Sequence, residues 1–208
     1  RLLTNARRSN GLWQITGQRQ ESWTHGKEGC SSSAPRCHHP EELFLDDERL
    51  HHVNSLNDVV PGSWYFDYES DTIYLADDPT GRKLETSVAS AAISGDADDV
   101  TIHGLTIEKF ANNAQRGAIM ADRVASSVTM GRNWQILDNV VRWNHGPGIR
   151  ASDQALIARN AVLYNGQLGI TSVRGADTVI EANEIGYNNV SGFDWGWEGG
   201  GTKFRETV

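Results

Sequence analysis

Apolar and polar positions repeat along the second half of the chain in three similar segments. Residues 135–144, 156–165 and 179–188 each follow closely the pattern x-Ile-x-x-Asn-x-(Val/Ile)-x-aromatic, and each ends in Asn. The copies begin 21 and then 23 residues apart (135, 156, 179). A glycine and a bulky apolar residue follow each copy after a short turn. These pairs are Gly148-Ile149, Gly169-Ile170 and Gly192-Phe193.

An earlier copy of the pattern spans residues 101–110, with Leu105 and Phe110 at the positions that hold Asn in the later copies. Its glycine step falls at 117–119, and the next copy begins 34 residues after it (101 to 135). We therefore expect most of the extra residues, in 122–132, to form a loop that leaves the repeat.

Short strands with alternating apolar positions, separated by turns too short for a helix, can pair only with the equivalent strand of the next copy. Such pairing stacks parallel sheets along an axis, with the apolar face inward. The pattern predicts an all-β fold, a right-handed parallel β-helix of about four coils. One inward row is expected to hold Ile102, Ile136, Ile157 and Ile180.

The recurring Asn predicts buried ladders, because a stacked Asn side chain can satisfy the backbone groups of the turns. One expected ladder is Asn139, Asn160 and Asn183, and a second is Asn144, Asn165 and Asn188. The glycine after the second ladder suits a bend that needs an unusual φ.

Residues 1–84 do not repeat and are expected to form a small antiparallel β-module, placed before or inserted beside the coils of 85–208. Residues 42–50 indicate a strand, a tight turn and a second strand, and residues 63–76 indicate a β-hairpin. The final residues, 202–208, read like the start of another coil, so further coils of a longer solenoid are expected as partners of this segment.

The repeat resembles that of the pectate-lyase-like superfamily of right-handed parallel β-helices over residues 85–204. This superfamily includes lyases, hydrolases, epimerases, esterases and phage tailspikes, so the resemblance implies the fold more than the reaction. The run from residue 42 to residue 88 is similar to a module that precedes the coils in secreted bacterial β-helix proteins. Several of those resemble glycoside hydrolases, including xylan-directed ones, which implies a carbohydrate-active protein.

Composition narrows the partners of the protein. The chain is 22% charged and carries a net charge of −8, so it lacks the basic footprint that nucleic-acid binding requires. No apolar run approaches the ~20 residues of a membrane-spanning helix, so membrane insertion is not expected. The acidity also weighs against a strongly anionic polysaccharide. A poly- or oligosaccharide remains the expected partner.

The two cysteines, Cys30 and Cys37, lie in a loop-like stretch. A disulfide between them would fit an extracellular or periplasmic location. Two free thiols are an alternative, and a zinc site with His38 and His39 is a third, although the spacing matches no standard pattern.

Side chains on the strand after each glycine step carry the candidate chemistry. If Ile149, Ile170 and Phe193 point inward, the alternation of a strand turns the next residue of each pair outward. The expected outward column is Arg150, Thr171 and Asp194, with Met120 one coil earlier. The turns that lead into this sheet carry His145 and Asn189. His145 is either a candidate proton shuttle or a plain surface histidine.

The segment from residue 192 to residue 203 concentrates unusual residues. Asp194 and Glu198 could supply the two carboxyl groups that glycosidic cleavage requires, or one member could come from a further coil. Aromatic rings offer flat surfaces to sugars, so Trp195 and Trp197 are candidate platforms with Lys203 beside them. The alternative is that the tryptophans pack into the loop and Glu198 simply pairs with Lys203.

These residues favour a secreted glycoside hydrolase that acts on a polysaccharide. A polysaccharide lyase or epimerase is the alternative enzyme, with Arg150 as a base or as a partner for a uronate carboxylate. A non-catalytic glycan-binding or structural solenoid is the alternative without catalysis. No cofactor is indicated, and no aspartate cluster beside Arg150 marks a Ca²⁺ site.

Overall fold

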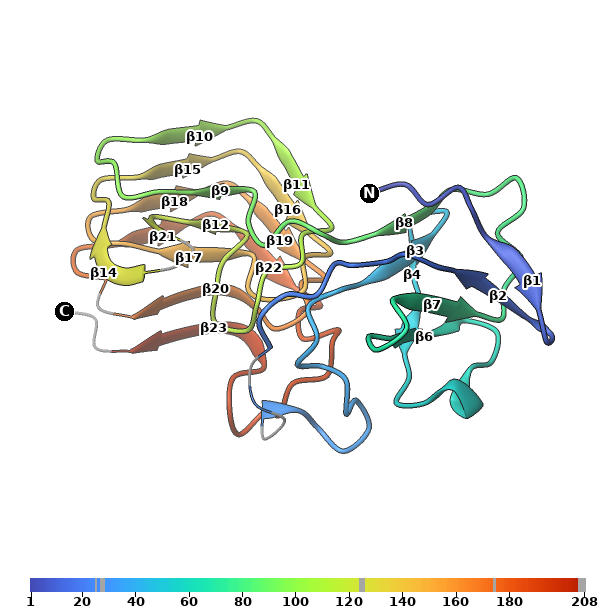
Figure 1. The fold of residues 1–208 in the computed structure, drawn as a ribbon. Helices are drawn as coiled ribbons and strands as arrows, with labels where there is room; N and C mark the ends of the chain where they lie inside the picture. Colours follow the sequence, from blue (N-terminus) through green and yellow to red (C-terminus); the bar gives the residue numbers. More distant parts are fainter. Residues whose placement is uncertain (25, 27–28, 124–125, 174, 206–208) are drawn as a thin grey trace.

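The computed structural model describes residues 1–24, 26, 29–123, 126–173 and 175–205. Its ribbon has two parts, a stack of coils that ends near the C-terminus and a smaller β-module that carries the N-terminus (Figure 1). No helix among the described residues is long and apolar enough to cross a membrane.

The coils form three parallel sheets, which confirms the parallel β-helix. The first sheet contains β10 (Thr101–His103), β15 (Gln135–Leu137), β18 (Leu156–Ala158) and β21 (Val179–Glu181). The second contains β11 (Thr106–Glu108), β16 (Val140–Arg142), β19 (Ala161–Leu163) and β22 (Glu184–Gly186). The third contains β9 (Ile93–Ser94), β12 (Ile119–Met120), β17 (Ile149–Ala151), β20 (Leu168–Val173) and β23 (Gly200–Arg205), and it lies across the front of the stack in Figure 1.

The predicted inward row of the first sheet is confirmed. Ile102, Ile136, Ile157 and Ile180 are direct partners in adjacent strands, and all four belong to or pack against one core cluster. Each coil adds one such apolar residue per sheet, so the hydrophobic free energy of folding accumulates along the axis of the stack.

Both asparagine ladders are confirmed as well. Asn139 donates to Asn160 at 3.0 Å, and Asn160 donates to Asn183 at 2.9 Å. The residue before each ladder asparagine has a positive φ, for example 56° at Arg159. The buried asparagine satisfies the backbone groups of the tight corner that this conformation creates. In the second ladder, Asn144, Asn165 and Asn188 are linked in the same way, at 3.0 and 3.1 Å.

Steric crowding explains the glycines at positions 148 and 169, whereas the expected unusual φ occurs at the third glycine, Gly192, with a φ of 77°. Neither Gly148 nor Gly169 has a positive φ. A Cβ at Gly169 would lie 2.5 Å from the Cγ2 of Ile185 and 2.8 Å from the side chain of Asn188. Glycine is required there because the chain passes directly against the ladder of the neighbouring coil.

The N-terminal module contains two small sheets. One has the order β1 (Arg7–Ser9), β2 (Leu12–Ile15), β7 (Thr72–Leu75), β6 (Ser63–Asp67) and β5 (His51–His52). The other has the order β4 (Glu48–Arg49), β3 (Leu43–Leu45) and β8 (Leu84–Thr86). The β3–β4 and β6–β7 pairs are the antiparallel hairpins predicted from residues 42–50 and 63–76. The module has its own core, and a 3-10 turn, η2 (Leu56–Asp58), links β5 to β6.

The register predicted for the last coil is wrong. Thr202, and not Phe193, pairs with Ile170, so Gly201 is the residue equivalent to Gly169. The chain leaves the coil after Asn188 and forms a loop before β23 restores the parallel pairing. The extra residues of 122–132 also leave the coil, and their described part is an antiparallel hairpin of β13 (Asp122–Arg123) and β14 (Ser126–Met130).

Candidate functional site

One row of side chains crosses the outer face of the third sheet. Met120 pairs with Arg150, Arg150 with Thr171, and Thr171 with Lys203. The predicted neighbours Met120, Arg150 and Thr171 do form one row, but Lys203 takes the place expected for Asp194, and Met120 and Thr171 are buried rather than open to solvent. The change of register decides this, since strand alternation fixes which residues of β23 point outward.

A buried carboxylate lies beside this row. Asp122 is fully buried, and its Oδ2 is 3.3 Å from Nη1 of Arg116 and 3.2 Å from Nη1 of Arg150. Burial raises the pKa of Asp122 in spite of the two guanidinium groups, and burial also lowers the pKa of Arg150. The Oδ1 of Asp122 and the Nε of Arg150 are buried and have no hydrogen-bond partner among the residues that the structure describes. Two polar atoms thus remain to be satisfied at the centre of the row.

Glu198 adds a second carboxylate at the end of the row. Its Oε1 lies 3.1 Å from Nζ of Lys203, which also donates to the carbonyl of Trp197 at 2.8 Å. Glu198 is also close enough to Arg150 to stabilise the charged guanidinium. The pairing of Glu198 with Lys203, foreseen as the alternative, is therefore observed. The side chain of Thr171 also forms a hydrogen bond within the row, because its hydroxyl donates to the carbonyl of Lys203 at 3.0 Å.

The other residues of the predicted cluster lie in the loop before β23. Asp194 is exposed, and its Oδ1 accepts from the amide of Gly196 at 2.7 Å, so it closes a local turn. The Asn189 side chain bonds Phe193 through both of its polar atoms, at 2.9 Å each. Both side chains shape the loop that brings Glu198 back to the sheet.

The two tryptophans of this loop differ in exposure. Trp195 is 73% exposed, and its ring passes close to Gly200 at the start of β23. Trp197 is half-buried against Phe193 and Gly29, so it packs the loop. Only Trp195 of this pair presents an open ring to a ligand.

The Cys30–Cys37 disulfide is confirmed, with an S–S distance of 2.10 Å. It excludes free thiols and a zinc site at these cysteines. The bridged segment holds the site loop in place, because Cys30 forms an isolated β-bridge with Phe193 and the amide of Asp194 donates to Gly29 at 2.9 Å.

His145 is buried, which corrects the expectation of a plain surface histidine. Its side chain is 2% exposed, with Nδ1 2.7 Å from Oε1 of Glu42 and Nε2 2.9 Å from the carbonyl of Cys37. Both partners accept hydrogen bonds, so both ring nitrogens donate when the imidazole is protonated. His145 therefore connects the coils to the N-terminal module.

Glu42 is the buried carboxylate of this connection. Burial by itself raises the pKa of Glu42, but Arg49 and His145 outweigh burial and hold the pKa at about 2. Arg49 lies 2.8 Å from Glu42 and also donates to Val190 and Ser191 in the loop after the last coil. The sequence offered no signal for this network, because Glu42 and His145 are 103 positions apart.

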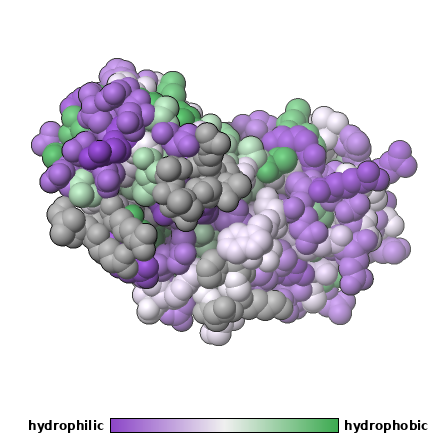
Figure 2. Space-filling view, turned by 60° about the vertical axis from the view of Figure 1, so that its left-hand side comes forward, coloured by the Kyte–Doolittle hydropathy of each residue, from purple (hydrophilic) through white to green (hydrophobic). Residues whose placement is uncertain are grey.

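Arg116 and Asp122 were missed for a related reason. Asp122 belongs to the stretch 122–132, which was expected to leave the coil as a loop, and only the fold brings Asp122 and Arg116 against the outward row. Among the described residues, no group of three or more His, Cys, Asp or Glu could hold a metal ion. In the orientation of Figure 2 the surface is mostly hydrophilic, and apolar residues form small separate patches. A ligand bound to this face would therefore contact mainly polar groups.

Neither a scan against protein-family models nor a search of curated proteins gives a match. Among solved structures, the chain is similar to XylC, whose structure is a complex with xylose. The TM-score is 0.73 at 13% sequence identity, with 91% of this chain and 42% of the XylC chain covered. The likeness shows the fold, and this chain spans less than half the length of XylC.

Proposed function

We propose that the outer face of the third sheet binds saccharide and that the whole protein is a glycoside hydrolase, located outside the cytoplasm. The observation that carries this proposal is the ion pair of Glu198 with Lys203, because it fixes a carboxylate at the end of a polar row beside an open tryptophan ring. Carboxylates supply the acid, base or nucleophile of glycosidic cleavage, and aromatic rings support sugar rings.

Each described side chain of the row has a role in this proposal. Lys203 holds the Glu198 carboxylate in position through their 3.1 Å contact, at the place proposed for a nucleophile, base or hydroxyl acceptor. Asp122 holds the guanidinium groups of Arg116 and Arg150 in place beside the row. The likeness to XylC, which binds xylose, supports the saccharide class, and the disulfide supports a location in an oxidising compartment.

The second carboxyl group of the reaction is proposed to come from outside these 208 residues. Asp194 is engaged in a local turn with Gly196, and Asp122 is fully buried between two arginines. Neither carboxylate is placed to attack or protonate a bound sugar. The 42% coverage of XylC is consistent with a site that further coils complete.

The test uses Glu198→Gln in the full-length protein, assayed by release of reducing ends from xylo-oligosaccharides and from a panel of other neutral oligosaccharides. We expect turnover to fall roughly 10²–10⁴-fold with the melting temperature nearly unchanged. Asp194→Asn is the matched control, an exposed carboxylate on the same loop that should keep near-parent turnover. Equal activity of parent and Glu198→Gln would refute the proposal for this carboxylate.

A polysaccharide lyase is the second candidate, because burial lowers the pKa of Arg150 and so favours its use as a base. A lyase leaves a carbon–carbon double bond in its product. Ultraviolet absorbance that rises with cleavage of a uronate polymer, and that is lost in Arg150→Lys, would favour the lyase over the hydrolase.

A further inference from the structure

A column of aromatic residues lies at a different corner of the solenoid, after each strand of the second sheet. Trp143, Tyr164 and Tyr187 occupy equivalent positions in consecutive coils, each with φ between 54° and 56°. Tyr164 and Tyr187 are stacked, with ring centroids 5.0 Å apart and planes 9° apart. Tyr164 is 40% exposed and Tyr187 70% exposed, so the inward core does not account for them.

A groove of about 570 Å³ separates this column from the β3–β4 hairpin of the N-terminal module. Its lining residues are Asp47, Glu48, Arg49, Trp143, Tyr164 and Val190. One wall is therefore aromatic and the other carries charged groups. The volume falls within the roughly 300–1,000 Å³ of ligand pockets in proteins.

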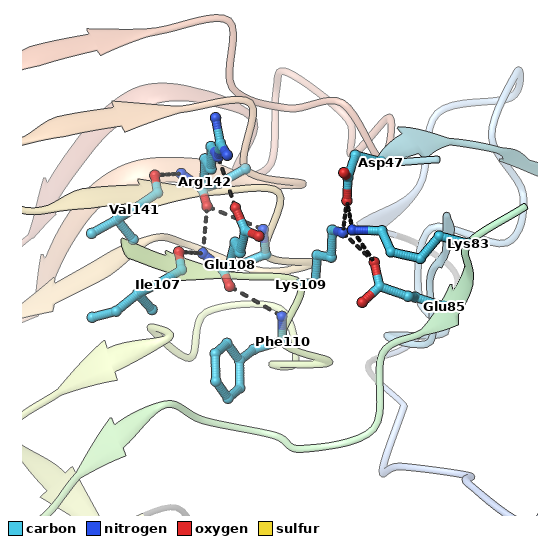
Figure 3. A network of polar contacts seen from close by, with 11 residues as sticks. Asp47, Lys83, Glu85, Ile107, Glu108, Lys109, Phe110, Val141 and Arg142 are labelled. Carbon is cyan, nitrogen blue, oxygen red and sulfur yellow. Dashed lines mark hydrogen bonds and ion pairs between the residues drawn. The ribbon is translucent and has the colours of Figure 1, made fainter. Parts of the chain in front are cut away.

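Polar contacts fix the upper end of the groove before any ligand arrives. Lys109, one coil above Trp143, contacts Asp47 and lies 2.5 Å from Glu85 (Figure 3). Its ammonium group also lies 5.7 Å from the centre of the Trp143 ring. A preformed wall of this kind lowers the entropy that binding costs.

A second set of contacts fixes the orientation of Trp143. The guanidinium of Arg142 lies 4.0 Å from the centre of the Trp143 ring and is itself bonded to Glu108 at 2.8 Å (Figure 3). One face of Trp143 is thus covered by protein.

The charges of the groove select the kind of ligand. Arg49 is paired with Glu42, and Lys109 is paired with Asp47, so the cations near the groove are already neutralised. Glu48 is exposed and forms no ion pair with the residues that the structure describes. An aromatic wall opposite free carboxylate oxygens suits the apolar face and hydroxyl groups of a neutral sugar. An anionic sugar would be repelled by Glu48, whereas the charge of Asp47 is balanced by Lys83 and Lys109.

We propose that this corner groove is a second saccharide-binding site, which takes a neutral oligosaccharide against Tyr164 and Trp143 with Glu48 as a hydroxyl acceptor. The site is formed by other strands than the row of the third sheet, so its existence does not rest on hydrolysis. It would hold a polysaccharide chain on the protein without cleaving it.

The experiment titrates xylohexaose and cellohexaose into the protein and follows backbone amide shifts together with the heat of binding. We expect amides at residues 47–49 and at Tyr164 to shift. Tyr164→Ala should raise Kd about five- to tenfold, which is the loss of one aromatic contact. Glu48→Gln should weaken xylohexaose less, and it should improve the binding of a hexagalacturonate that the parent binds poorly.

The matched control is Trp195→Ala, which removes an exposed aromatic residue near the third sheet and should leave the shifts at 47–49 unchanged. Glu198→Gln separates the two proposals, because it should lower hydrolysis by orders of magnitude and leave this binding intact. An unchanged Kd in Tyr164→Ala, or shifts confined to β20 and β23, would overturn the corner site. The absence of shifts with both neutral hexasaccharides at millimolar concentration would also overturn it and leave the groove to a protein partner.

Discussion

Glu42→Gln should weaken the junction between the two parts of the protein in a pH-dependent way. The Glu42 carboxylate is buried between Arg49 at 2.8 Å and His145 at 2.7 Å, and it also accepts from the hydroxyl of Ser191 at 2.9 Å. Glutamine keeps the size of the side chain and removes its charge. The variant therefore leaves the half-buried Arg49 guanidinium without its counter-charge and the buried His145 ring without its carboxylate partner.

The pKa of Glu42 gives the size of the effect. The pKa is about 2 in the folded protein, against 4.5 for an unperturbed glutamate. At about 1.4 kcal/mol for each tenfold change in proton affinity, this difference corresponds to roughly 3 kcal/mol of folding free energy at neutral pH. Removal of one partner from a buried ion pair typically costs about 3–5 kcal/mol, so the two estimates agree.

The sign of the pH dependence follows from the direction of the shift. A carboxyl group with a lowered pKa in the folded state stabilises the fold above the unfolded pKa of 4.5, and this contribution is lost as the pH falls toward 2. About half of it should remain near pH 3. Burial raises the pKa of neighbouring Glu41, which acts in the opposite sense. That contribution is common to parent and variant, so it cancels in their difference.

The assay is urea-induced unfolding of parent, Glu42→Gln and the control Glu48→Gln, at about pH 7, pH 5 and pH 3. Glu48 lies on β4 beside Arg49 and is exposed, so its variant should differ from the parent by less than about 0.5 kcal/mol. A Glu42→Gln difference below about 1 kcal/mol at neutral pH would refute the reasoning. A difference that stays constant between pH 5 and pH 3 would refute the assigned pKa.

Two further predictions concern the frame of the molecule. Asn160→Ala should destabilise the fold by about 1–3 kcal/mol in the same assay, because the hydrogen-bond partners of Asn160 in two adjacent coils are left unsatisfied. The control Asn183→Ala should cost less, because Asn183 is only half-buried. Equal losses in the two variants would argue against burial as the cause. Replacing both Cys30 and Cys37 with serine should lower the free energy of unfolding by about 2 kcal/mol, because it releases a short closed loop. The measurement is a lower urea midpoint. An unchanged midpoint would show that packing alone holds this segment.

The sequence alone determined the solenoid. Apolar alternation, recurring Asn and glycine steps define one coil, and each coil pairs mainly with its neighbours, so local spacing contains the information about the stacking. This is why the row from Ile102 to Ile180 and both asparagine ladders were predicted correctly. The two hairpins of the N-terminal module were also predicted, because turn residues between short apolar runs define a hairpin locally.

The tertiary structure decided which residues meet at the candidate site. The sequence placed Asp194 in the outward row because Gly192-Phe193 imitates the earlier glycine steps, but the pairing of Cys30 with Phe193 draws that segment into a loop. Lys203 takes the place in the row, and Glu198 reaches the row through Lys203. His145 and Glu42 meet across the junction of the module and the coils. Contacts between segments so distant in sequence depend on how loops pack, and no short-range spacing encodes that packing.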